Sequence, residues 1–224
     1  MFIPLLENIN IEGRDITADA LLTQRTLASH VVERGAHYHF TVKGNQPKLK
    51  ADIALLFEKR KLPDFVEVTP PDHGRIETRS IWCSNALNEY IDFPHVGQVF
   101  MIERHVVHKK SGDASCEVAY GVTSRTMEQA TPQRILKVNR DHWTIENRCH
   151  YVIDWNFDED RSRICKGYGP ENVTRLRRFA VGVIQFIYRG NSSIAEKMQE
   201  LNRNTRQVFD YLRMTNNSTR PQVL

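Results

Sequence analysis

The first part of the chain alternates β-type and helical patterns of hydrophobic residues. Residues 14–20 predict a short strand, and residues 22–34 predict a helix that ends near Gly35. Residues 37–43 are rich in β-formers and predict a second strand, and Pro47 opens a helix that runs to about residue 59. A strand, a helix and a strand in this order predict a right-handed parallel crossover.

The middle of the chain has strand patterns only. Residues 65–69, 75–83, 98–108 and 114–123 predict strands, and residues 109–113 form the turn of a hairpin between the last two. We therefore expect a mostly antiparallel extension of the sheet.

From Pro132 onward the pattern is helical. We expect helices over residues 142–155, 170–189 and 192–214. A charged loop, residues 158–163, lies between the first two of them. The predicted fold class is α/β: a mixed sheet with flanking helices, a β-rich insertion and a helical C-terminal third. The predicted divisions are residues 1–63, 64–131, 132–214 and a flexible tail at 215–224.

Composition narrows the function classes without selecting one. The 224 residues carry a formal net charge of +4, which is compatible with a nucleic-acid partner and insufficient to show one. The four cysteines, Cys83, Cys116, Cys149 and Cys165, form no C-x-x-C pair, so we interpret them as reduced thiols with a packing role in a cytoplasmic protein. The longest apolar segment, residues 179–188, is too short to span a membrane.

Two acidic residues stand where chemistry is expected. Asp19 ends the first predicted strand, where a carboxylate could hold Mg²⁺ or simply cap the helix that follows. Glu146 aligns with His142 and His150 at helical spacing, which predicts either a functional or a solvated helix face. A zinc site there is disfavoured because the spacing is not H-E-x-x-H.

Four segments in order resemble the DDE transposases of bacterial insertion sequences, in the branch that includes the H-repeat-associated proteins. They are residues 16–24 (ITADALLTQ), 38–47 (YHFTVKGNQP), 73–79 (HGRIETR) and 140–155 (RDHWTIENRCHYVIDW). The resemblance covers about residues 5–190.

This resemblance implies an RNase H-like fold in which three acidic residues bind two Mg²⁺ ions, with Mn²⁺ as an alternative, for cleavage and transfer of DNA strands. Asp19 matches the second acid and Glu146 the third. Residues 64–125 match the insertion between them. The partners implied are insertion-sequence ends and target DNA. Independently of the resemblance, open strand edges favour association with a second copy of the chain, and no membrane partner is expected.

The first acid of the family has no counterpart here. Only eighteen residues precede Asp19, and Asp15 shares its strand. We therefore expect the C-terminal portion of a transposase, with weak metal binding and little or no strand transfer. The alternatives are an inactive remnant that binds DNA or a partner, and a metal-dependent nuclease unrelated to transposition.

Several basic and polar residues are candidates for DNA contact. They are Lys43, Asn45, Gln46, Arg75, Arg140, His142, Arg148, Arg175 and Arg178. Each has an ordinary alternative: a turn with a solvated lysine at 43–46, an Arg/Glu-paired strand surface at 75–79, and a solvated helix face elsewhere.

Overall fold

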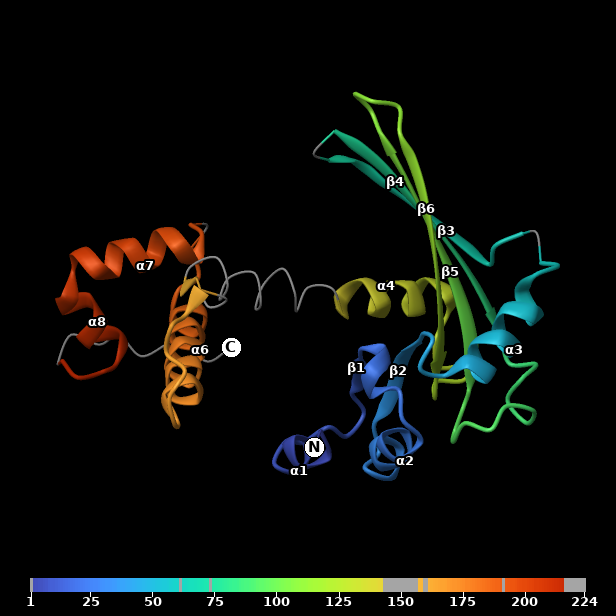
Figure 1. Cartoon of the computed structure of the whole chain (residues 1–224), viewed down its shortest axis with the longest axis horizontal. Coiled ribbons are helices and arrows are strands. Elements are labelled where there is room, and N and C mark those ends of the chain that lie inside the picture. Colours follow the sequence, from blue (N-terminus) through green and yellow to red (C-terminus); the bar gives the residue numbers. More distant parts are fainter. Residues whose placement is uncertain are drawn as a thin grey trace. The chain divides into compact units, whose positions relative to one another are not determined.

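The computed structural model describes residues 2–60, 62–72, 74–142, 157–158, 161–190 and 192–215. The chain forms two compact units, Met1–His142 and Trp143–Leu224 (Figure 1), and each is described by itself. Helix α4 (Pro132–His142) belongs to the first unit, where it contacts the sheet.

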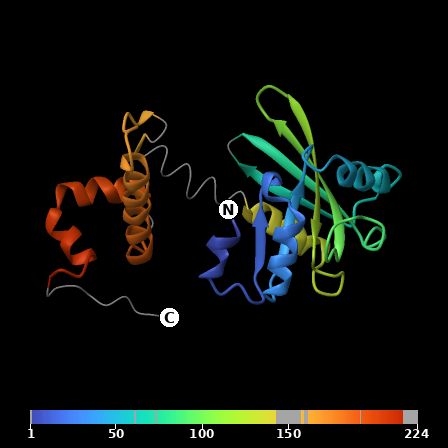
Figure 2. The ribbon, with the colours of Figure 1, turned by 60° about the horizontal axis from the view of Figure 1, so that its bottom comes forward.

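The first unit is built on a six-stranded sheet in the order β1-β2-β6-β5-β4-β3. After α1 (Ile3–Glu7), the chain forms β1 (Asp15–Ala18), α2 (Arg25–Glu33) and β2 (His37–Val42). Strands β1 and β2 are parallel, as predicted, and lie side by side at one edge of the sheet (Figure 2). The helix predicted over 22–34 is α2, which begins only at Arg25 because the chain first turns through the 3₁₀ helix η1 (Ala20–Leu22).

The remaining strands are antiparallel, as the sequence predicts. They are β3 (Phe65–Asp72), β4 (Arg75–Ser84), β5 (Gln98–His108) and β6 (Ala114–Thr123). The β5–β6 hairpin has the predicted bounds, and β6 also pairs antiparallel with β2. The α/β fold class, a mixed sheet with flanking helices, is confirmed and is consistent with a partial RNase H-like fold.

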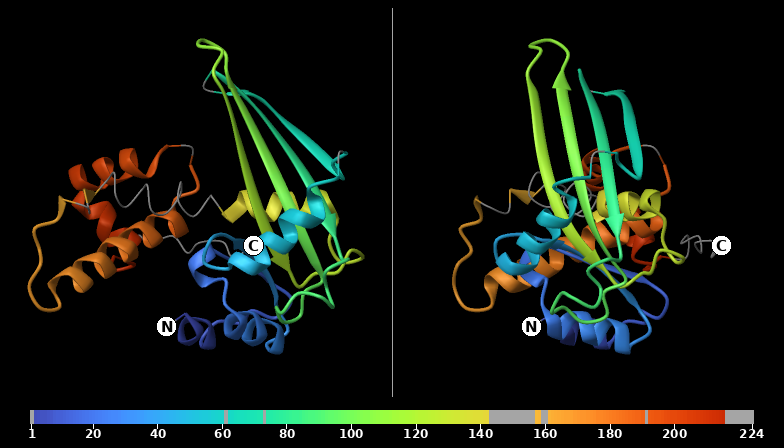
Figure 3. Two further views of the ribbon diagram at one scale, coloured as in Figure 1. Left: turned by 45° about the vertical axis from the view of Figure 1, so that its right-hand side comes forward. Right: turned by 90° about the vertical axis from the view of Figure 1, so that its right-hand side faces the viewer.

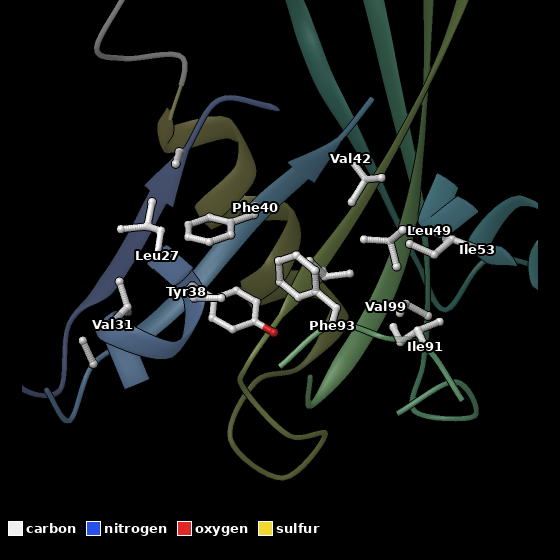
Figure 4. Close-up of a cluster of buried hydrophobic side chains, with 14 of the residues drawn as sticks. Leu27, Val31, Tyr38, Phe40, Val42, Leu49, Ile53, Ile91, Phe93 and Val99 are labelled. Atoms are coloured by element: carbon white, nitrogen blue, oxygen red, sulfur yellow. The ribbon is translucent and has the colours of Figure 1, made fainter. Parts of the chain in front are cut away.

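One face of the sheet carries the larger core. Helix α2 packs there through Leu27 and Val31 against Tyr38 and Phe40 of β2, and Ile53 of α3 (Pro47–Phe57) lies near Val99 of β5 (Figure 4). Side chains of a strand alternate between faces, so this face receives Ile16 and Ala18 of β1 and leaves Asp15 and Thr17 on the other. We call the first the α3 face and the second the α4 face.

The α4 face carries a smaller core beneath Ile135 and Leu136 of α4. Phe100 of β5 is fully buried there and stacks on His39 of β2, with ring centroids 4.6 Å apart. The Phe100 ring occupies the space beside Gly121, where an added Cβ would lie 2.0 Å from a ring carbon. Glycine at 121 is therefore required by packing.

The second unit is helical, with α6 (Gly169–Ile187), α7 (Ile194–Arg203) and α8 (Thr205–Tyr211). The single helix predicted over 192–214 is wrong: it is broken at Asn204, whose side chain accepts a hydrogen bond from the backbone N–H of Gln207 and so caps α8. Of the helices in the described ranges, none is long and apolar enough to cross a membrane.

The close contact at Gly121 generates a prediction about stability. We expect Gly121→Ala to lower the free energy of unfolding of the first unit by about 1–3 kcal/mol or more, because the methyl group must displace the buried Phe100 ring. Urea unfolding followed by circular dichroism measures the change. Gly44→Ala is the matched control, since an added Cβ there meets nothing within 4 Å; equal effects of the two substitutions would contradict the packing argument.

Burial of His39 generates a second prediction, about pH. Burial lowers the pKa of His39 from 6.5 to about 3, so the unfolded chain takes up a proton first as the pH falls. The free energy of unfolding should therefore decrease by about 1.4 kcal/mol per pH unit between about pH 6 and pH 5 from this residue. Urea unfolding at several pH values measures this slope. We expect His39→Leu to reduce it and His108→Gln, at an exposed position, to leave it unchanged; an unchanged slope in His39→Leu would refute the assignment.

Candidate functional site

A row of polar side chains follows β1 on the α4 face. Asp15 and Thr17 lie on this face within the strand, and Asp19 comes two residues later, where the backbone is still extended with φ −67° and ψ 161°. The parallel neighbour β2 places His37, His39 and Thr41 on the same face, because its residues are in register with those of β1. The carboxyl ends of both strands thus meet at one end of this row, where sites in open α/β sheets form.

Asp19 has two contacts at this position. Its Oδ1 accepts a hydrogen bond of 2.7 Å from the backbone N–H of Ala20, which caps η1. The same oxygen lies 3.6 Å from Nζ of Lys43, which follows β2. Since the two side chains are 59% and 66% exposed, this ion pair adds little stability and leaves the carboxylate open to solvent and to ligands.

The loops after β1 and β2 are tied together by side chains. The amide groups of Asn45 and Gln46 donate to the backbone carbonyls of Ala20 and Thr23, at 2.5 and 2.9 Å. The buried Thr23 hydroxyl donates to the carbonyl of Thr41 at 2.6 Å. Asn45 and Gln46 therefore order the loop that carries Asp19.

Asp15, which sequence reasoning sets aside, is held by two arginines. Its carboxylate receives hydrogen bonds from Arg125 at 2.5 Å and from Arg134 of α4 at 2.7 Å. Burial alone would raise the pKa of Asp15, but the two guanidinium groups outweigh this effect and hold the pKa below its usual value. The carboxylate of Asp15 therefore fixes α4 against β1 through Arg134.

The last residue of α4 also contacts β1. Nδ1 of His142 lies 3.0 Å from the Thr17 hydroxyl, so the end of this helix is placed two residues from Asp19 along the strand. Between β1 and α4 lies an open pocket of about 390 Å³. Its lining is polar and mixed in charge: Asp15, Thr17, Arg134, Lys137, Val138, Asp141 and His142.

The other basic candidates are largely engaged by acidic partners. Arg140 pairs with Glu67 of β3 at 2.7 Å, and Arg175 pairs with Glu171 one helical turn away at 2.5 Å. On β4, Glu77 pairs with Arg79 at 2.6 Å, which is the Arg/Glu-paired surface that the alternation there allows. Burial alone would raise the pKa of Glu77, but Arg104, Arg79 and the exposed Arg75 outweigh this effect and hold the pKa below its usual value.

Arg178 is exposed on α6. Glu146 and Arg148 lie outside the described residues, as do His73 and His150. The structure therefore places Asp19, Lys43, Asn45, Gln46 and His142 at one edge of the first unit.

Two of the cysteines differ from the packing role predicted for them. Cys83 is buried as expected, but Cys116 and Cys165 are exposed. Within the part of the chain that the structure describes, the residues Glu103, His105 and Cys116 form the group whose ligand atoms are close enough to share a metal ion. Asp19 is not a member of it.

Comparison with known proteins gives the family. A model of the transposase DDE domain matches residues 1–169. The chain is 26% identical over 190 residues to the "H repeat-associated putative transposase YhhI" of Escherichia coli K12, a match that covers 80% of this chain and 50% of the relative. It is 27% identical over 217 residues to the "Putative transposase YncI" of Escherichia coli O157:H7, covering 93% of this chain and 55% of the relative.

A further similarity, 27% identity over 190 residues, is to YbfL of Escherichia coli K12, with 80% of this chain and 50% of the relative covered. The chain thus spans about half the length of these curated relatives. Because the family model covers well over half of the chain and the relatives include H-repeat-associated proteins, the chain belongs to the DDE transposase family, in the H-repeat-associated branch.

Proposed function

We propose that this chain contributes two carboxylates, Asp19 and Glu146, to metal-dependent cleavage and transfer of DNA strands at insertion-sequence ends. The observation that carries the proposal is the position of Asp19 in a transposase DDE domain. Its exposed carboxylate stands at the carboxyl end of β1, 3.6 Å from the amine of Lys43. An acidic residue for a metal and a cation for a phosphate are thus adjacent.

The donor chemistry of Asp19 suits the divalent cation that the family implies. An ionised carboxylate offers hard oxygen ligands, which Mg²⁺ and Mn²⁺ prefer. Asp19 would supply one such ligand and Glu146 another. When bound, the metal would polarise the phosphodiester and activate the attacking oxygen.

Glu146 enters the proposal through the sequence, because it stands in the segment 140–155 that resembles the family, where it matches the third acid. Within the first unit, His142 of α4 contacts Thr17 of β1, and Arg134 near the other end of α4 pairs with Asp15. In this proposal Asp15 and His142 are positioning residues, while Asp19 and Glu146 act on the substrate.

DNA phosphates would be met by cations near Asp19. Lys43 has a flexible side chain and only a weak, exposed ion pair to leave. Lys137 lines the pocket between β1 and α4. Arg140 and Arg175 would first have to leave acidic partners, so we expect smaller contributions from them.

A second function is kept because of the length of the match. The chain spans about half of its curated relatives, so their whole activity is a proposal for it, and DNA or partner binding without strand transfer is the second candidate. A nuclease unrelated to transposition is the third alternative. Activity and its products distinguish the three.

The proposed roles of the two carboxylates generate a prediction about activity. With supercoiled plasmid carrying the DNA that flanks the gene, and with Mn²⁺ or Mg²⁺, we expect Asp19→Asn and Glu146→Gln each to reduce nicking by about a hundredfold or more. The Asn variant keeps a side-chain oxygen that can cap η1, so loss of activity would report the charge and not the cap.

Controls separate the alternatives. Asp52→Asn, on α3 away from β1, should nick at the wild-type rate. Joined as well as cut products would support strand transfer, and cut products alone would support a nuclease. DNA binding without nicking by the wild-type chain would favour the inactive remnant.

The proposed role of Lys43 generates a prediction about DNA binding. We expect Lys43→Gln to weaken DNA binding, and to reduce the slope of log K against log salt by about one, because one phosphate contact is lost. Fluorescence anisotropy at several salt concentrations measures this slope. Lys50→Gln, which removes an exposed lysine on α3, is the matched control; equal slopes for the two variants would exclude a specific role for Lys43.

A further inference from the structure

The outer half of the β4–β5–β6 sheet extends beyond the helices. In β6 the first five residues, from Ala114 to Val118, are exposed, while the last three are buried. Figure 3 shows these strands and their turns projecting past α3 and α4. Because none of these five β6 residues is buried, core packing does not explain the polar ones among them.

Charged groups are divided between the two faces of this outer half. Glu77, Arg79, Arg104 and Glu117 lie on the α4 face and pair with one another. Glu103, His105 and Cys116 lie on the α3 face, by the alternation along β5 and the register with β6. The β4 residues paired with Glu103 and His105 are Ser80 and Thr78, and neither is charged.

The three side chains on the α3 face converge. His105 stands directly opposite Cys116 in the ladder, and Glu103 is two residues earlier on the same strand. Nε2 of His105 lies 3.4 Å from Oε2 of Glu103 and 3.6 Å from Sγ of Cys116. All three ligand atoms lie within 4.8 Å of one another.

These separations match a tetrahedral metal site. Zinc bonds of ~2.3 Å to sulfur and ~2.0–2.1 Å to nitrogen and oxygen, at tetrahedral angles, place ligand atoms roughly 3.3–3.6 Å apart. A hydrogen bond between imidazole and carboxylate would instead favour ~2.7–3.2 Å. The His105–Glu103 distance of 3.4 Å therefore fits a shared ion better than a direct hydrogen bond, and the His105–Cys116 distance of 3.6 Å is compatible with a shared ion.

We propose that Glu103, His105 and Cys116 bind a transition metal of the zinc class, with water as the fourth ligand. A thiolate and an imidazole select Zn²⁺ or Co²⁺ over Mg²⁺, so this site is chemically distinct from the one proposed at Asp19. The metal links β5 to β6 in the exposed half of the hairpin. Binding to the folded chain stabilises it by mass action.

Cobalt titration of the full, reduced chain tests the proposal. We expect one equivalent of Co²⁺ to give the intense visible bands of tetrahedral cobalt and a thiolate-to-cobalt charge-transfer band. Zn²⁺ should then displace the cobalt, and a large excess of Mg²⁺ should not. Zn²⁺ should also raise the melting temperature of the wild-type chain.

Variants identify the ligands. Cys116→Ser should abolish the charge-transfer band, and His105→Gln and Glu103→Gln should each weaken cobalt binding by roughly tenfold or more. Cys165→Ser removes another exposed thiol, and Glu117→Gln removes a carboxylate from the opposite face; both should bind cobalt as the wild type does. These positions are exposed or partly exposed, so we expect the variants to fold, and circular dichroism checks this.

Three results would overturn the proposal. One is the absence of a charge-transfer band in the wild-type chain. Another is a band that survives Cys116→Ser. The third is a band lost in Cys165→Ser, which would assign the thiolate elsewhere.

Discussion

Strand β2 pairs in parallel with β1 on one side and antiparallel with β6 on the other, and these two ladders hold the first unit together. They join the β1–α2–β2 unit to the antiparallel strands β3 to β6, which begin more than twenty residues after β2 ends. The shared register aligns Thr17, His39 and Thr123 across three strands. The hydroxyl of Thr123 donates to the carbonyl of Tyr38 at 2.8 Å and ties the end of β6 to β2. The position of Asp19 therefore depends on contacts far along the chain.

Ion pairing decides which basic residues remain available to a polyanion. The net charge of +4 suggests a basic surface, but Arg125, Arg134, Arg140 and Arg175 each have a carboxylate within 2.7 Å. These pairs fix α4 to the sheet, tie the loop after β6 to β1, or lie along a helix surface. The residues that can meet DNA at small cost are therefore fewer than the sequence suggests, and Lys43 is among them.

The sequence predicts most of the fold because its signals are local. Alternation and turn residues place the four antiparallel strands, and the strand–helix–strand order identifies the parallel pair. It misses the break at Asn204, where a side-chain cap interrupts an otherwise helical pattern. It also misses the role of Asp15, because its partner Arg125 lies in the loop after β6, and no pattern in the sequence indicates that this loop lies beside β1.

The same limit applies to the candidate site. The location of Asp19 at the candidate site is predictable because it follows a strand. The proximity of Lys43 is predictable because the strand–helix–strand order makes β1 and β2 parallel, so that their carboxyl ends meet. The group around His105 could have been found from the predicted hairpin alone, since a turn at 109–113 pairs residue 105 with residue 116. Cysteine spacing along the sequence conceals this pairing, because the ligands lie on opposite sides of the turn.

Gly121 also affects the exposed end of the β5–β6 hairpin, because it helps to fix the register between the two strands. It stands opposite Phe100, whose ring fills the space that a side chain would need. If β6 slipped by two residues, Ala119 or Thr123 would stand there, and neither leaves that space empty. The same slip would bring Ala114 or Val118 opposite His105 in place of Cys116. The absence of a side chain at Gly121 in the core thus determines which side chains lie opposite each other at the exposed end of the hairpin.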